Sequence, residues 1–164
     1  MDSVLKNLIY ERKILSIGET IINTSLISVN YDFENYYLET TNRRYSLKIN
    51  KKNDDQCSVI NRMYKDIQFN PLTSREIYYS DPEILLMEYF QAESPDMRFF
   101  NQHIFGESIA KFHSKRESHY GYGYDTYIGS LLQENKMSQS WKKFYLNQRF
   151  DCLLSKMKKT FVIF

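Results

Sequence analysis

The order of the predicted elements constrains the fold most, because every strand pattern lies in the first 90 residues and only helix and loop patterns follow. Apolar residues at a period near 3.6 predict an opening helix over Ser3–Ser16, and a second one-faced pattern predicts a short helix over Cys57–Ile67. Runs rich in β-branched and aromatic residues predict five strands, at Thr20–Val29, Tyr36–Thr41, Arg44–Ile49, Glu76–Tyr79 and Ile84–Phe90. Strands followed by helices indicate an α+β protein.

The second half of the chain is predicted to be mostly helical. We predict a helix over Phe99–Lys115 with its apolar residues facing inward, and a loop over Gly121–Leu132. A final helix begins at Met137 or Ser138 and reaches about Lys158. The chain therefore divides into a strand-rich lobe (residues 1–90), a linker (91–98) and a helical region (99–164).

Composition excludes several classes of partner. The 164 residues have a net charge of +2 with acids and bases interspersed, so no strong field would attract nucleic acid or a membrane surface. The apolar runs fall short of the roughly 20 residues that span a bilayer, and the first residues do not form a signal peptide. Cys57 and Cys152 are isolated, which predicts free thiols in a reducing cytoplasm.

The most specific pattern lies between Phe105 and Phe150. A helix-like run with Ala-x-x-His (110–113) leads to Gly-Tyr-Gly (121–123), Asp-Thr-x-Ile-Gly (125–129), Gln-x-Asn (133–135) and Trp-x-x-Phe (141–144), followed by Arg149. This order resembles the fructosamine kinase (ketosamine kinase) family, small-molecule kinases of the protein-kinase-like fold. The resemblance implies a kinase-like N-lobe, a five-stranded antiparallel sheet plus a helix, followed by the first helices of a truncated C-lobe.

The resemblance also implies a nucleotide site in the strand-rich lobe. Lys48 looks like the strand lysine that holds nucleotide phosphates, although a surface lysine on a strand edge is the plain alternative. The segment at 85–90 resembles the hinge, with Met87 as gatekeeper and Tyr89 between two adenine contacts, the Glu88 carbonyl and the Phe90 N–H. A core strand that ends in a loop would satisfy the same letters.

Three parts of the family pattern are altered. The turn at Ser28–Phe33 contains no glycine, whereas related kinases have Gly-Gly or similar there for close approach to phosphates. The helix at 57–67 has no glutamate to pair with Lys48; Asp55 could reach it, but a solvated acidic turn is the preferred interpretation. The sequence contains no His-Gly-Asp, His-Arg-Asp or Asp-Phe-Gly tripeptide, so we predict no catalytic residue in this chain.

Two further groups of residues are candidate sites. Trp141, Phe144, Tyr145 and Arg149 share one helix face, which favours a core stripe. The alternative is that this helix and the 120–135 loop form one wall of a sugar-binding site. The side chains of Asp125, Gln133 and Asn135 would then form hydrogen bonds with the hydroxyls of the bound sugar. The three histidines have no spacing that places two ligands on one helix turn, so we predict no metal site.

The sequence thus predicts a fructosamine kinase-like protein of the cytoplasm. The resemblance implies ATP and Mg as cofactors and a small-molecule sugar-amine as substrate, with the chain itself truncated, inactive and only weakly able to bind ATP. The alternatives are a non-catalytic kinase-like remnant or interaction module, and a fragment of an aminoglycoside- or choline-type kinase. Self-association is expected through exposed apolar side chains near the C-terminus, at Phe144, Leu153, Leu154, Phe161, Val162 and Phe164.

Overall fold

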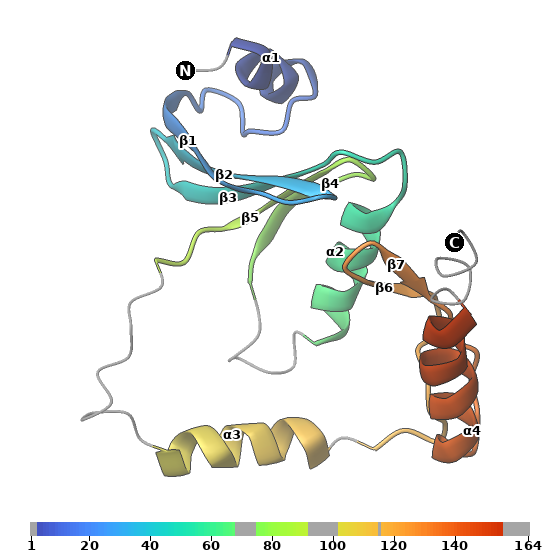
Figure 1. Cartoon of the computed structure of the whole chain (residues 1–164). Coiled ribbons are helices and arrows are strands. Elements are labelled where there is room, and N and C mark those ends of the chain that lie inside the picture. Colours follow the sequence, from blue (N-terminus) through green and yellow to red (C-terminus); the bar gives the residue numbers. More distant parts are fainter. Residues whose placement is uncertain (1–2, 68–74, 92–101, 115, 156–164) are drawn as a thin grey trace. The chain divides into compact units, whose positions relative to one another are not determined.

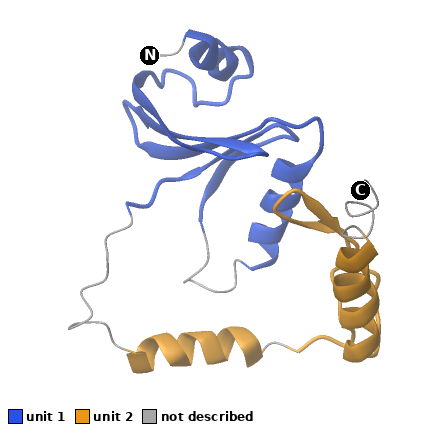
Figure 2. Ribbon diagram, viewed as in Figure 1, with its two compact units in different colours: residues 1–100 blue, residues 101–164 orange. Residues whose placement is uncertain are grey.

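The chain divides into two compact units, residues 1–100 and residues 101–164 (Figure 2). The computed structural model describes residues 3–67, 75–91, 102–114 and 116–155. Within these residues no helix combines the length and the apolar character needed to cross a membrane.

Unit 1 is a five-stranded antiparallel sheet with a helix on each face (Figure 1). Its elements are α1 (Ser3–Glu11), β1 (Ile21–Val29), β2 (Phe33–Thr40), β3 (Arg44–Asn50), α2 (Gln56–Asp66), β4 (Ile77–Ser80) and β5 (Ile84–Glu88). The strand order is β1-β2-β3-β5-β4, with all neighbours antiparallel. The predicted α+β lobe is therefore confirmed. Helix α1 ends earlier than predicted, because Lys13 adopts a φ of 52° that no right-handed helix can continue.

The alternation of side chains along β3 and β5 separates two apolar clusters. One cluster packs α1 against one face of the sheet, and its buried members are Leu5, Ile9, Ile14, Leu38, Tyr45, Leu47, Ile84 and Leu86. The other lies on the face covered by α2, and its buried members are Phe33, Cys57, Leu85 and Met87. A period of two along a strand directs neighbouring residues such as Leu85 and Leu86 to opposite faces.

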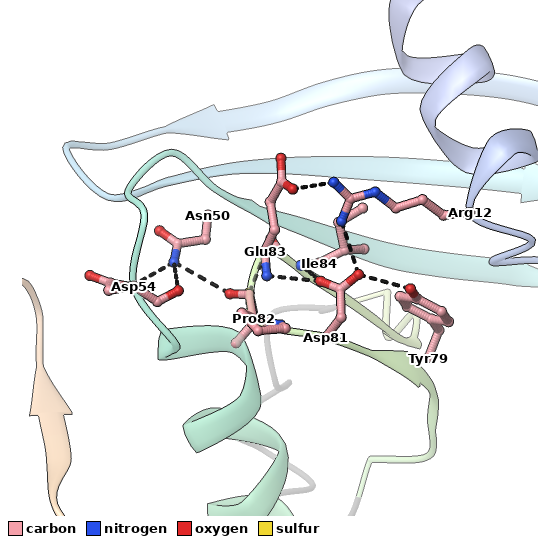
Figure 3. A network of polar contacts seen from close by, with 9 residues as sticks. Arg12, Asn50, Asp54, Tyr79, Asp81, Pro82, Glu83 and Ile84 are labelled. Carbon is pink, nitrogen blue, oxygen red and sulfur yellow. Dashed lines mark hydrogen bonds and ion pairs between the residues drawn. The ribbon is translucent and has the colours of Figure 1, made fainter.

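A polar network ties the end of α1 to the turn between β4 and β5 (Figure 3). The Asp81 carboxylate accepts hydrogen bonds from the backbone N–H groups of Glu83 (2.8 Å) and Ile84 (2.6 Å), and from the Tyr79 hydroxyl (2.8 Å). Arg12 donates to Asp81 at 3.0 Å and also pairs with Glu83. Burial acts to raise the pKa of Asp81, but these hydrogen bonds outweigh it and lower the pKa below the ordinary value of 3.8.

Replacing Asp81 with alanine should therefore destabilise unit 1 by about 2–3 kcal/mol, because two backbone donors and the Tyr79 hydroxyl lose their acceptor. Glu83→Ala is the matched control, since Glu83 also pairs with Arg12 but caps no turn, and it should cost less than about 1 kcal/mol. Urea denaturation at pH 7 would measure both. Because folding lowers the pKa of Asp81, its ionised carboxylate stabilises unit 1 in full above the unfolded-state pKa of 3.8. This stabilisation is lost as the pH falls through the lower pKa of the folded state. The stability difference between wild type and Asp81→Ala should therefore shrink below pH 3.8. Equal losses in both variants at pH 7 would show that the turn does not depend on Asp81.

Unit 2 contains α3 (Gln102–Ser114), a small hairpin of β6 (Thr126–Ile128) and β7 (Leu131–Gln133), α4 (Trp141–Tyr145) and a π-helical turn η1 (Leu146–Phe150). The predicted loop at 121–132 is wrong in part, because Gly129 takes a φ of 56° and lets the chain reverse into the hairpin. Residues 151–155 continue the helical conformation after η1.

The final helix begins later than predicted, at Trp141 instead of Met137 or Ser138. Ser138 exchanges two backbone hydrogen bonds with Tyr120, and the Ser140 hydroxyl caps the helix by accepting from the Lys143 N–H. The predicted end near Lys158 lies outside the described residues.

Burial in unit 2 differs from the prediction at two places. Helix α3 has no buried residue, so the expected inward face is not found among its described residues. Phe144 is buried, contrary to the expectation that it would be exposed, whereas Leu153 and Leu154 are exposed as expected. The remaining apolar residues of that expectation, Phe161, Val162 and Phe164, lie outside the described residues.

Candidate functional site

Lys48 lies in the centre of unit 1, on the face of the sheet that α2 covers. It pairs with Asn35 on β2 and with Leu85 on β5. Its side chain is half-buried, and its Nζ lies 4.5 Å from the centroid of the Phe33 ring, which is a cation–π distance. Lys48 therefore points into the apolar cluster of that face and is not a strand-edge residue.

The charge of Lys48 has no acidic counterpart in the described part of the chain. Burial lowers the pKa of Lys48 below its ordinary value of 10.5, and the nearby Arg75 lowers it further. Burial raises the pKa of the Cys57 thiol to about 12, so this neighbour is neutral at pH 7. Asp55, considered as a partner from the sequence, is exposed just before α2 and forms no ion pair with Lys48.

Arg75 belongs to no sequence motif, so the sequence does not identify it as a candidate site residue. Its Nη1 lies 3.7 Å from the Met87 Sδ, and its guanidinium lies 5.2 Å from the centroid of the Phe90 ring. It forms no ion pair among the described residues. Arg75 thus brings a second positive charge to the face of the sheet that carries Lys48.

The predicted hinge residues lie at the end of β5, on the strand next to Lys48. Met87 pairs with Ser46 on β3 and is buried. Glu88 donates its backbone N–H to the Glu76 carbonyl at 2.8 Å, which anchors the end of the strand. Register alone therefore brings the segment at 85–88 alongside the strand that contains Lys48.

The two residues after β5 differ in how they are held. Tyr89 packs edge-on against Tyr37, with 4.8 Å between ring centroids. Phe90 is 49% exposed, and its backbone N–H donates to no group among the described residues. The Phe90 N–H is therefore not used by another described residue, and a ligand on a hinge would need such a donor.

The turn before β2 is held by its own side chain instead of being open to a ligand. The Asn30 Oδ1 accepts the backbone N–H groups of Asp32 (3.0 Å) and Phe33 (2.7 Å), which is an Asx-type turn. Lys52 pairs with Asp32 and also lies 4.5 Å from the Tyr31 ring centroid. Two donors that could face a phosphate are therefore engaged within the turn.

In unit 2, the polar residues proposed to bind sugar fall on and beside the β6–β7 hairpin. Asn135 is buried and donates from Nδ2 to the Tyr124 carbonyl (3.0 Å) and the Thr126 hydroxyl (2.8 Å). Its Oδ1 accepts from Arg149, and its N–H donates to Asp125 (3.0 Å). Asn135 thus joins the hairpin to η1.

Asp125 is exposed and Gln133 is partly exposed at the end of β7. The Asp125 carboxylate already accepts the Asn135 N–H, and the predicted role of all three residues in binding sugar stays a prediction.

A surface pocket of about 490 Å³ lies beside the Asp81 network (Figure 3). Several of its lining residues are engaged with one another: Arg12 pairs with Asp81 and Glu83, and Asn50 donates to Asp54 at 2.6 Å. Within the described residues, no group of three histidine, cysteine or acidic side chains could hold a metal ion.

Comparison with known proteins agrees with this architecture. The model of the family described as "Fructosamine kinase" matches residues 8–163. A relative from Enterococcus faecium, named "Probable ketoamine kinase", is 25% identical over 132 residues, which cover 77% of this chain and 46% of the relative.

Two solved structures, each named a "putative fructosamine-3-kinase", share the fold. The structure from Haemophilus somnus has a TM-score of 0.70 and 22% identity, covering 88% of this chain and 50% of its own. The structure from Thermobifida fusca has a TM-score of 0.73 and 17% identity, covering 98% and 55%. The chain therefore spans about half the length of the relatives it matches. Because the family model matches nearly the whole sequence, this chain belongs to the fructosamine kinase family.

Proposed function

We propose that this chain carries the nucleotide-binding lobe of an ATP-dependent ketosamine kinase, with adenine against the end of β5 and the phosphates beside Lys48. The observation that carries the proposal is the pairing of β3 with β5, in which Lys48 lies opposite Leu85 and Ser46 lies opposite Met87. A fixed cation one strand away from a hinge with an accessible N–H suits a nucleotide that spans both. The substrate class, a small-molecule sugar-amine, is taken from the family.

Each residue has a distinct part in this proposal. The half-buried Lys48 would offset phosphate charge in a setting where water screens it little. The Glu88 carbonyl and the Phe90 N–H would hold the adenine edge, with Met87 behind the ring and Tyr89 fixed by Tyr37. Magnesium, which bridges phosphate oxygens in kinases when bound, is assigned to no residue of this chain.

The hinge contact can be tested without changing a side chain that Lys48 touches. Phe90→Pro removes the backbone N–H, whereas Phe90→Ala removes the ring and keeps that N–H. We expect adenosine binding, measured by calorimetry, to weaken about tenfold or more in Phe90→Pro relative to Phe90→Ala, the size of one hydrogen bond left unmade. Thermal unfolding of both variants controls for folding. Equal affinity in the two variants, or no adenosine binding by the wild type, would contradict the hinge assignment.

A non-catalytic binding module is the second candidate. It is favoured by the turn before β2, whose Asp32 and Phe33 N–H groups are engaged by Asn30 and not open to phosphate. A coupled ADP-release assay with a fructosamine substrate separates the candidates. Turnover that disappears in Lys48→Ala would exclude the non-catalytic module, and turnover at background with adenosine still bound would favour it.

A further inference from the structure

Two positive side chains share one face of the sheet in unit 1. Lys48 lies over Phe33, and Arg75 contacts Met87, and both of these apolar residues belong to the cluster under α2. Met87 and Leu85, the strand partner of Lys48, lie two residues apart on β5, and the positive charge of Arg75 contributes to the lowered pKa of Lys48. Both cations therefore lie against the same apolar cluster.

The pair has no negative partner in the described part of the chain. Neither side chain forms an ion pair there, and their polar surroundings are a neutral thiol at Cys57 and a thioether at Met87. Two half-buried like charges repel one another, and in a protein such an arrangement calls for an anion. The turn before β2 offers that anion little help, because two of its backbone donors are engaged by Asn30.

We propose that Lys48 and Arg75 form a cation pair that binds a polyphosphate, with Arg75 as the second phosphate contact in place of donors from a glycine-rich turn. This inference rests on the proposed nucleotide site and extends it by one residue. Arginine suits the role because its planar group can donate two parallel hydrogen bonds to phosphate oxygens. The competing explanation is structural: Arg75 would only cover Met87 and the Phe90 ring.

The pH dependence of binding tests whether the charges of Lys48 and Arg75 interact. A bound anion favours the charged form of Lys48, whose pKa is lowered in the free protein. As the pH is raised, affinity should therefore begin to fall before the pH reaches the ordinary lysine pKa of 10.5. Removing the Arg75 charge relieves part of that lowering, so the fall should move to higher pH in Arg75→Gln. Cys57, the other titratable neighbour, has a pKa near 12 and stays neutral over most of this range. A profile that stays in place in Arg75→Gln would mean that the two charges lie too far apart to share one anion.

The experiment uses inorganic tripolyphosphate, which tests the cation pair without adenine. We expect Arg75→Gln and Lys48→Gln each to weaken tripolyphosphate binding about tenfold, the size of one charge-assisted hydrogen bond. Arg44→Gln is the matched control, because it removes the same charge from β3 at a residue that pairs with Glu39, and it should change affinity less than about twofold. Arg75→Lys keeps the charge but loses the planar pair of donors, so it should lose less affinity than Arg75→Gln. Thermal unfolding of each variant controls for misfolding.

Adenosine measured on the same variants separates this inference from the proposed function. Arg75→Gln should weaken adenosine binding much less than tripolyphosphate binding, because adenosine has no phosphate, although Arg75 contacts Met87 and lies near the Phe90 ring. Tripolyphosphate binding without adenosine binding would support the cation pair and overturn the proposed hinge. Equal losses in Arg75→Gln and Arg44→Gln, or no tripolyphosphate binding by the wild type, would overturn the cation pair.

Discussion

Replacing Gly121 with alanine is expected to destabilise unit 2 by about 3 kcal/mol. Gly121 has a φ of 119°, a conformation that costs other residues about 1–3 kcal/mol. A Cβ there would also lie 3.1 Å from the Asn135 carbonyl oxygen and 3.2 Å from the Phe144 ring, which overpacks the junction of hairpin and helix. Neither contact can relax without moving backbone or a buried ring.

Gly123 provides the control for this prediction. It lies two residues away in the same Gly-Tyr-Gly turn, its φ is outside the positive range, and a Cβ would meet nothing within 4 Å. Gly123→Ala should therefore change stability by less than about 0.5 kcal/mol. Trp141 is the single tryptophan and contacts both Tyr120 and Phe144, so its fluorescence during urea denaturation reports on unit 2. Similar midpoints for the two variants would contradict the tight packing at Gly121.

Replacing Leu86 with alanine should destabilise unit 1 by about 2–5 kcal/mol. Leu86 is fully buried, pairs with Leu47 across β3 and β5, and belongs to the cluster that packs α1 on the sheet. Its truncation loses the free energy of burial and leaves a cavity that the neighbouring strands cannot fill. This loss is a large fraction of the roughly 5–15 kcal/mol that a domain of ordinary size has in total.

Leu26→Ala is the matched control, because Leu26 lies on the edge strand β1 and is 53% exposed. We expect it to cost less than about 1 kcal/mol. Hydrogen exchange of the amides in β3 and β5 measures the stability of unit 1 alone, whereas Trp141 fluorescence reports on unit 2. An equal loss of protection in both variants would mean that α1 and the sheet do not form the core assigned to them.

The elements of unit 1 follow from local patterns, and their boundaries do not. The period of two along β3 and β5 predicts which residues share a face of the sheet. Leu47 and Lys48 indeed lie on opposite faces. The early end of α1 depends on the positive φ of Lys13 and on the contact of Arg12 with the β4–β5 turn. Such contacts join residues far apart in the chain, so no local pattern reports them.

The residues of the candidate site also differ in whether the sequence alone identifies them. Lys48 and the hinge residues could be named from the sequence because each occupies a recognisable place in a strand of a known family. Arg75 could not, because its proximity to Lys48 arises only when β4 pairs with β5 and β5 pairs with β3. Likewise, Asn135 appears in the sequence as one more polar loop residue, and only folding shows it bonded to Arg149.

The sequence by itself determined the family and the α+β order of elements in unit 1, because these depend on residue spacing along the chain. The tertiary structure decided which charges meet, which glycine is irreplaceable and which aromatic ring is buried. Those outcomes depend on the register of paired strands and on backbone torsions, which bring distant residues within ångströms of one another. Phe144 shows the difference: its spacing on a helix is visible in the sequence, but its burial against Gly121 is a property of the folded unit.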